Sequence, residues 1–327
     1  QKLIEMKKIL IVGAGGQIGS ELVPHLRSIY GNSNVVAADI SAEKCKALAE
    51  AGPFEELNAL DGEGFSAIVK KYNIDTIFNL VALLSATGEK NPKLAWDINI
   101  GALTNSLYIA KDNNCAVFTP SSIGAFGNDT PKDKTPQDTL QRSNTTIYGV
   151  CKVTGELLSD YYFNRFGVDT RSVRFPGLIS YVTLPGGGTT DYAVEIYYDA
   201  IRKGSFTCNV KEGTYMDMMY MPDALNAVVQ LMEADPSKLK HRNSFNIASM
   251  SFEPEQIAAE IRKHISDFKM DYQIDPVKQA IANSWPNSMD DTCAREEWGW
   301  APKFDLTSMT NDMLIKVKEK FDKGLIK

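Results

Sequence analysis

The sequence lacks the features that point to secreted, membrane-spanning or nucleic-acid-binding proteins. Its five cysteines are odd in number, widely spaced and without a C-x-x-C pair, which disfavours a disulfide framework and indicates a reducing compartment. No apolar run approaches the ~18 residues that a membrane span requires. The net charge is -6 and Lys and Arg form no cluster, so we expect neither nucleic acid nor an anionic membrane as a partner.

Histidine is also scarce, and no targeting segment is evident. The three histidines, His25, His241 and His264, lie far apart along the chain and none is paired with a cysteine, so we expect no metal site. The first residues have neither an apolar signal region nor a small-residue cleavage site. Met6 is a candidate natural start, with residues 1–5 as an extension. We therefore expect a cytoplasmic protein, or a mitochondrial one if the source is eukaryotic.

Short apolar runs alternate with longer periodic segments through the first half of the 327 residues. Strands are predicted at 8–12, 35–39, 55–58, 74–80, 115–119 and 169–174, with helices at 17–30, 42–51, 61–72, 91–111 and 145–166. This alternation predicts an α/β fold with a doubly wound parallel sheet of the Rossmann type. We expect an NAD-binding Rossmann domain over 1–175. Residues 176–327 are expected to form mainly a smaller α/β substrate-binding lobe, whose chain could cross back to the first domain.

A glycine-rich turn joins the first strand to the first helix. Gly13, Gly16 and Gly19, with Gln17 and Ile18 between them, allow a tight turn and let backbone N–H groups approach a pyrophosphate at the helix N-terminus. A glycine pattern alone is weak evidence, but here the strand and the helix that it requires are both predicted. The sequence therefore predicts a dinucleotide site.

An acidic residue at the end of the second strand indicates which dinucleotide. Asp39 lies 20 residues after Gly19, where a carboxylate accepts hydrogen bonds from ribose hydroxyls and repels a 2′-phosphate, which favours NAD over NADP. Asp39 could instead cap a helix from Ser41 onward. Asp61 is open to two interpretations, a residue near the adenine or a helix N-cap.

A tyrosine and a lysine four residues apart form the candidate catalytic pair. Tyr148 and Lys152 fall on one face of the predicted helix. A neighbouring ammonium and the positive nicotinamide ring favour the phenolate, which can then act as a general base. Ser122 follows the fifth strand, at the sheet edge where ligands of such folds bind. Each pattern alone is common, but their order after the glycine turn is specific.

These motifs together resemble the extended short-chain dehydrogenase/reductase family over nearly the whole chain. The matching stretches are G-x-x-G-x-x-G at 13–19, Asn79 to Ala82, the serine pair at 121–122, Y-x-x-x-K at 148–152 and a closing element at 291–302. The resemblance implies catalysis by Ser122, Tyr148 and Lys152, with Asn99 linked to the lysine. The cofactor contacts that it implies are completed by Leu60, Leu80, Ala82, Asn99, Tyr148, Lys152, Pro176 and Leu178.

Departures from the family pattern narrow the expected substrate. The segment after the sixth strand lacks the asparagine that nucleotide-sugar members use, and residues 184–193 resemble the metal-independent branch that oxidises L-threonine at C3. Glycine N–H groups and hydroxyls of that loop suit a small carboxylate. Asp191 is interpreted as a helix N-cap, and Trp285 as a pocket cap or a core residue. The substrate residues implied are Ser85, Ser122, Tyr148, Gly187, Thr189, Thr190 and Trp285.

The resemblance also implies a homodimer and metabolic coupling to a ligase that forms glycine from 2-amino-3-oxobutanoate. Two alternatives stay open at this point. One is a nucleotide-sugar epimerase or dehydratase on the same scaffold. The other is an NAD-binding sensor or scaffold without turnover, which the intact set of Ser122, Tyr148 and Lys152 disfavours.

Overall fold

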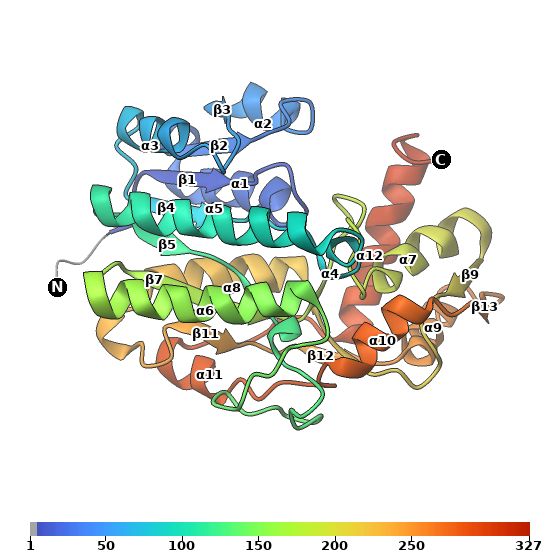
Figure 1. Cartoon of the computed structure of the whole chain (residues 1–327). Coiled ribbons are helices and arrows are strands. Elements are labelled where there is room, and N and C mark those ends of the chain that lie inside the picture. The colour runs from blue at the N-terminus through green and yellow to red at the C-terminus, as the bar shows by residue number, and fades with distance from the viewer. Residues whose placement is uncertain (1–4) are drawn as a thin grey trace.

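The computed structural model describes residues 5–327, and its first half is built on a parallel sheet (Figure 1). Seven strands follow the order β11-β7-β5-β4-β1-β2-β3, and the short β6 pairs with β7. All pairings in this sheet are parallel. The strands are β1 (Ile9–Val12), β2 (Val35–Asp39), β3 (Phe54–Glu56), β4 (Thr76–Asn79), β5 (Ala116–Phe118), β6 (Ser121–Ser122), β7 (Thr170–Phe175) and β11 (Asn243–Asn246).

Helices cover both faces of this sheet because its strands are apolar on both sides. In β1, Ile9 and Ile11 join one core with α1 (Gly19–Tyr30) and α8 (Met221–Glu233). Leu10 and Val12 join a second core, on the other face, with α3 (Gly62–Lys71) and α5 (Pro92–Asn113). Alternate residues of a strand point to opposite faces, so one short sequence serves two layers. The predicted doubly wound fold is confirmed.

A second, smaller lobe carries its own core. It contains a three-stranded sheet, β12-β10-β8, and a two-stranded one, β13-β9. Its elements are β8 (Gly177–Ile179), α7 (Tyr192–Lys203), β9 (Ser205–Cys208), β10 (Met216–Tyr220), β12 (Met250–Phe252), α9 (Pro254–Arg262), β13 (Lys269–Tyr272), α10 (Pro276–Ser284) and α12 (Leu306–Asp322). The chain returns to the first sheet through α8, β11 and α11 (Thr292–Trp298). The boundary between two domains at residue 175 stays a prediction.

The remaining helices are α2 (Lys46–Ala51), α4 (Ser85–Gly88) and α6 (Ile147–Phe166), with three short 3₁₀ turns at Asn32–Asn34, Ile123–Ala125 and Pro236–Lys238. The helix predicted over 42–51 begins only at Lys46, because residues 42–45 form turns. None of the helices within residues 5–327 combines the length and apolarity that a bilayer crossing requires.

The two lobes meet at a partly buried carboxyl group. Glu21, in the first turn of α1, accepts a hydrogen bond from the Ser180 hydroxyl at 2.5 Å, directly after β8. Burial raises the pKa of Glu21 to about 7, although the Ser180 hydrogen bond and the nearby Lys320 ammonium act in the opposite direction. The folded protein therefore binds a proton here more tightly than the unfolded chain does.

This shift predicts a pH-dependent effect of Glu21→Gln on stability. The Glu21 carboxyl contributes most below its ordinary pKa of 4.5, and that contribution is lost as the pH rises through about 7. The amide does not ionise, so the variant should gain stability over the wild type by at most about 1.4 kcal/mol per pH unit within that window. Urea unfolding at pH 5 and pH 8 measures the difference. Glu63→Gln is the control, because Glu63 is exposed. If the difference in unfolding free energy between Glu21→Gln and the wild type is the same at pH 5 and pH 8, the prediction is contradicted.

Candidate active site

A cleft of about 620 Å³ lies where the two lobes meet, at the carboxyl ends of the parallel strands. Both lobes contribute to its walls, and most residues that the sequence singled out line it. These are Gly13, Gly16, Gln17, Ile18, Gly19, Leu80, Ala82, Ser85, Ser122, Tyr148, Lys152, Pro176, Leu178, Thr189, Thr190 and Trp285. Five others do not line it, namely Asp39, Leu60, Asp61, Asn99 and Gly187.

The glycine turn brings helix α1 as close to strand β1 as backbone allows. Gly13 has a φ of +84°, a conformation that glycine adopts without strain, and its N–H donates to the Ala38 carbonyl at 2.9 Å. A Cβ on Gly19 would lie 2.5 Å from the Gly13 oxygen. A Cβ on Gly16 would meet only that oxygen, at 3.4 Å. Gly19 is therefore required by packing, whereas the packing leaves room for a Cβ at Gly16, which lines the cleft.

Asp39 lies behind the turn and holds it. Its carboxylate accepts hydrogen bonds from the N–H groups of Gly15 at 2.8 Å and Ser41 at 2.9 Å. No helix begins at Ser41, so the capping alternative is wrong for Asp39. A carboxylate has about four acceptor positions, and these two bonds leave capacity for ribose hydroxyls.

Asp61 and Leu60 have structural roles outside the cleft. Asp61 caps α3 by accepting from the Gly64 N–H at 3.0 Å, as one of its two interpretations predicted. Leu60 is exposed, and one of its methyl carbons lies 2.6 Å from where a Cβ on Gly101 of α5 would be.

Helix α6 and the end of β6 assemble the candidate catalytic residues. The helix begins with a Thr146 cap, whose hydroxyl accepts from the Gly149 N–H at 3.0 Å. Lys152 donates to the Pro120 carbonyl at 2.7 Å, and its Nζ lies 5.3 Å from the centre of the Tyr148 ring. A Cβ on Gly124 would lie 3.1 Å from the Tyr148 ring and 3.3 Å from the Ser122 Oγ. The serine, the tyrosine and the lysine are therefore neighbours at one wall.

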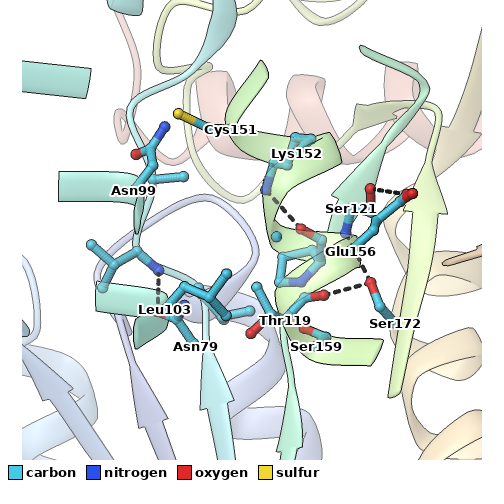
Figure 2. A pocket seen from close by; sticks show the side chains of 15 residues that line it. Asn79, Asn99, Leu103, Thr119, Ser121, Cys151, Lys152, Glu156, Ser159 and Ser172 are labelled. Atoms are coloured by element: carbon cyan, nitrogen blue, oxygen red, sulfur yellow. Dashed lines mark hydrogen bonds between the residues drawn. The ribbon is translucent and has the colours of Figure 1, made fainter. Parts of the chain in front are cut away.

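A small cavity of about 30 Å³ lies behind Lys152 (Figure 2). Asn99 lines it, but its amide is bonded to the backbone of Leu83, through Leu83 N–H to Oδ1 at 2.7 Å and Nδ2 to the Leu83 carbonyl at 3.2 Å. Among residues 5–327, the hydrogen bond of the Lys152 ammonium goes to Pro120. Asn99 thus fixes the segment after β4 that lines the cleft, and its expected link to the lysine stays a prediction.

Another part of the cleft wall carries two buried hydroxyl groups. Ser85, at the start of α4, and Thr189 are both buried, and their hydroxyl oxygens are 3.1 Å apart. Trp285 follows α10 and is 6% exposed, so it lines the cleft and belongs to the core of the second lobe at once. The two interpretations of Trp285 are therefore compatible.

Asp191 stands at the N-cap position of α7, as the sequence predicted, but its side chain does not cap the helix. Its carboxylate accepts no capping bond from α7 and instead binds the N–H groups of Gly187 at 3.0 Å and Gly188 at 2.8 Å. Burial raises the pKa of Asp191 to about 6 against the effect of these two bonds. The glycine donors that the sequence suggested for a substrate carboxylate are thus held by a carboxylate of the chain itself.

Sequence reasoning missed several residues that line the cleft. Lys44 borders it next to Gly15, and Leu83, Leu84 and Thr87 come from the segment around α4. Their position in the sequence was the signal that could have identified the residues around α4. They follow β4, whose carboxyl end lies at the same sheet edge as the ends of β1 and β5.

One histidine lies beside a cysteine although the sequence shows no paired histidine and cysteine; whether the pair holds a metal is a separate question. His241 and Cys293 are 52 residues apart in sequence, yet the Nε2 and Sγ atoms lie 4.0 Å apart. This pair lies outside the cleft.

Comparison with known proteins agrees with this geometry. The family model described as the NAD-dependent epimerase/dehydratase family matches residues 9–248. The chain belongs to this family. The resemblance to extended short-chain dehydrogenases/reductases is thereby confirmed. The protein is an oxidoreductase, and its cofactor is NAD.

Individual relatives cover almost the whole chain. An uncharacterized epimerase/dehydratase of Staphylococcus haemolyticus is 58% identical over 315 residues, 96% of this chain and 99% of that protein. The fold is similar to an L-threonine dehydrogenase of Clostridium difficile, with 57% identity, a TM-score of 0.94, and 97% and 99% of the two chains covered. A monomeric L-threonine 3-dehydrogenase from a metagenome is 43% identical, with a TM-score of 0.91 over 95% and 99%.

The cleft residues of this family member fit the dinucleotide. The amide nitrogen of Gln17 is buried beside the glycine turn and has no hydrogen-bond partner within residues 5–327. Together with the open space at Gly16, this amide gives the cleft wall at the glycine turn a polar group and room for a ligand.

Two glycine substitutions should separate packing from cofactor binding. We expect Gly19→Ala to lower the melting temperature, because its Cβ would overlap the backbone of the turn. Gly16→Ala should leave the melting temperature without NAD nearly unchanged and weaken NAD binding at least tenfold, because its Cβ would enter the cleft. Thermal unfolding and NAD titration measure the two effects. Equal melting losses for both variants would contradict the geometry.

Proposed function

We propose that this protein oxidises L-threonine at its C3 hydroxyl to 2-amino-3-oxobutanoate, with transfer of a hydride to NAD⁺. The observation that carries the proposal is that Ser122, Tyr148 and Lys152 line the same cleft as the buried hydroxyl groups of Ser85 and Thr189. The similarity to L-threonine dehydrogenases at up to 57% identity supports it.

The roles of the chain's own residues follow from their positions. Tyr148 takes the proton of the C3 hydroxyl as a general base. The Lys152 ammonium lies 5.3 Å from the centre of the Tyr148 ring and places a positive charge beside the proposed base. The Ser122 hydroxyl donates to the oxygen that becomes the ketone. NAD⁺, when bound, accepts the hydride from C3.

Another part of the cleft wall orients the amino acid. On this proposal, Ser85, Thr189 and Thr190 offer hydroxyls to the carboxylate, and Trp285 closes the pocket against water. Gly187 and Gly188 take part only if their N–H groups exchange Asp191 for the substrate. A cytoplasmic location and a downstream ligase that releases glycine belong to the same proposal.

The first experiment follows NADH absorbance with purified protein, NAD⁺ and L-threonine in the presence of a chelator. D-threonine, L-allo-threonine and NADP⁺ are the controls, and we expect turnover with L-threonine and NAD⁺ only. Absence of NADH from every amino acid would contradict the threonine assignment and leave the family and cofactor standing. Nucleotide-sugars would then be the next substrates to test, because the chain belongs to the NAD-dependent epimerase/dehydratase family.

Replacement of the proposed base should abolish most turnover. We expect Tyr148→Phe to lower kcat by roughly 10²–10⁴-fold with NAD binding retained, since the ring stays and only the hydroxyl is lost. Tyr161→Phe on the same helix is the control, because Tyr161 is 54% exposed and outside the cleft. A Tyr148→Phe variant with near-normal turnover would overturn the base assignment.

We also propose that two copies associate through α5 and α6. The two helices lie side by side on the sheet (Figure 1). Their outer surface presents Tyr108, Leu157, Tyr161 and Phe166, each more than 40% exposed. Tyr161 and Phe166 stack edge to face at 5.9 Å, and the Lys111 ammonium lies over Tyr108 and Phe166. A contiguous exposed apolar surface of this kind favours association.

Leu157→Glu should convert the dimer to a monomer, because the new carboxylate would be buried between the copies. Analytical ultracentrifugation measures the mass. Leu325→Glu is the control, since Leu325 is 68% exposed near the end of the chain. A monomeric wild type, as the metagenome relative is described, would contradict the proposal.

A further inference from the structure

A histidine, a cysteine and two carboxylates converge at the β11 edge of the main sheet. Cys293 and Glu297 lie four residues apart on α11, so both side chains project from one face of that helix. His241 precedes β11, and Asp138 comes from the segment between the 3₁₀ turn at 123–125 and α6. One ligand atom each from His241, Cys293 and Glu297 lie within 4.8 Å of one another.

The imidazole has different neighbours at its two nitrogens. Nδ1 is hydrogen-bonded to the Glu297 carboxylate, whose other oxygen accepts from the backbone N–H groups of Lys240 at 2.7 Å and His241 at 3.1 Å. Nε2 faces the Asp138 carboxylate at 2.9 Å and the Cys293 sulfur at 4.0 Å. Glu297 is thus a fixed partner on one side, and Nε2 is surrounded by a sulfur and an oxygen on the other.

We propose that His241 Nε2, Cys293 Sγ and an Asp138 oxygen bind a borderline-soft divalent cation of the Zn²⁺ class, with Glu297 orienting the imidazole. Nitrogen, thiolate and carboxylate are the donors that Zn²⁺ takes in proteins. A ligating histidine ordinarily donates its second N–H to a carboxylate, the role that Glu297 has here. Water supplies the fourth position, since the Asp138 side chain is 80% exposed.

The distances require only a small adjustment. Bonds of about 2.0–2.1 Å to nitrogen and about 2.3 Å to sulfur at tetrahedral angles place the two ligand atoms ~3.6 Å apart. The observed Nε2 to Sγ distance of 4.0 Å is near this value. The exposed Asp138 carboxylate has to move back by a few tenths of an ångström from its hydrogen bond.

The cation competes with a proton at the histidine. Burial lowers the pKa of His241, but the hydrogen bonds and charges of Glu297 and Asp138 outweigh burial and leave this pKa above its ordinary value. These two carboxyl groups face the ring, with the Cys293 thiol beside them. Binding therefore releases protons.

The site is separate from the proposed reaction. None of its residues lines the cleft, so the proposed oxidation does not depend on it. Asp138 adjoins Gln137, whose amide already binds β11 through the Ser244 carbonyl at 2.6 Å and the Asn246 N–H at 2.7 Å. The cation would add a link between α11 and the segment that leads into the Tyr148 helix, and so stabilise the folded state.

Cobalt provides the direct test on the full-length protein. After chelator treatment and reduction with a phosphine, Co²⁺ titration should give thiolate-to-cobalt charge-transfer and tetrahedral d–d absorption that saturates at one equivalent. Zn²⁺ should displace the cobalt and raise the melting temperature. The other four cysteines are buried, so the thiolate band is assignable to Cys293.

Variants decide the ligand set. Cys293→Ser should abolish the charge-transfer band and the melting shift, His241→Gln should abolish both, and Asp138→Asn should weaken binding at least tenfold. Asp129→Asn, an exposed carboxylate on the same segment, should change nothing. NADH formation should be the same in Cys293→Ser as in wild type. Absence of stoichiometric Co²⁺ uptake, or a band that persists in Cys293→Ser or His241→Gln, overturns the proposal.

Discussion

The geometry of the active-site wall depends on a buried ion pair between helix α6 and strand β7. Arg174 donates to Glu156 through Nε at 2.8 Å and Nη2 at 3.1 Å, with both side chains at most 5% exposed. Ser121 and Gln141 donate to the same carboxylate, so the desolvated charges are satisfied. Glu156 is one helical turn from Lys152 and two from Tyr148, and Ser121 adjoins Ser122. One ion pair therefore sets the tyrosine and the lysine relative to the serine.

The first half of the fold was predictable because its signals are local. A parallel strand buried on both faces is a continuous apolar run, and a covering helix has period 3.6, so the predicted bounds from β1 to β7 agree with the structure to within a few residues. The second lobe gave no such pattern. Its β8 and β10 pair across about forty residues, and β9 with β13 across about sixty, and no local periodicity encodes those pairings.

The candidate active site was likewise predictable only where its signals are local. The glycine turn and the Y-x-x-x-K pair lie where the sequence placed them, because each needs only its own strand or helix. The choice of hydrogen-bond partner was not predictable. A loop of glycines shows that donors exist but not that Asp191, three or four residues later, accepts from them. The contact of His241 with Cys293 could not be predicted for a related reason. Spacing in sequence says nothing about two segments that fold onto one sheet edge.

The two walls of the cleft differ in whether a ligand would add hydrogen bonds or replace existing ones. At the glycine turn, the Gln17 amide nitrogen has no hydrogen-bond partner within residues 5–327, so a cofactor bound there would add a bond without breaking one. In the part of the cleft proposed to hold the substrate, the polar groups already bond to one another. Ser85 bonds to Thr189, and Asp191 accepts from Gly187 and Gly188. A ligand there exchanges bonds, which is nearly neutral only if every displaced donor finds a new acceptor. A carboxylate meets that condition and a plain secondary alcohol does not, because it leaves buried donors unpaired. On the proposed function, this is the physical basis for selecting an amino acid over a simple alcohol.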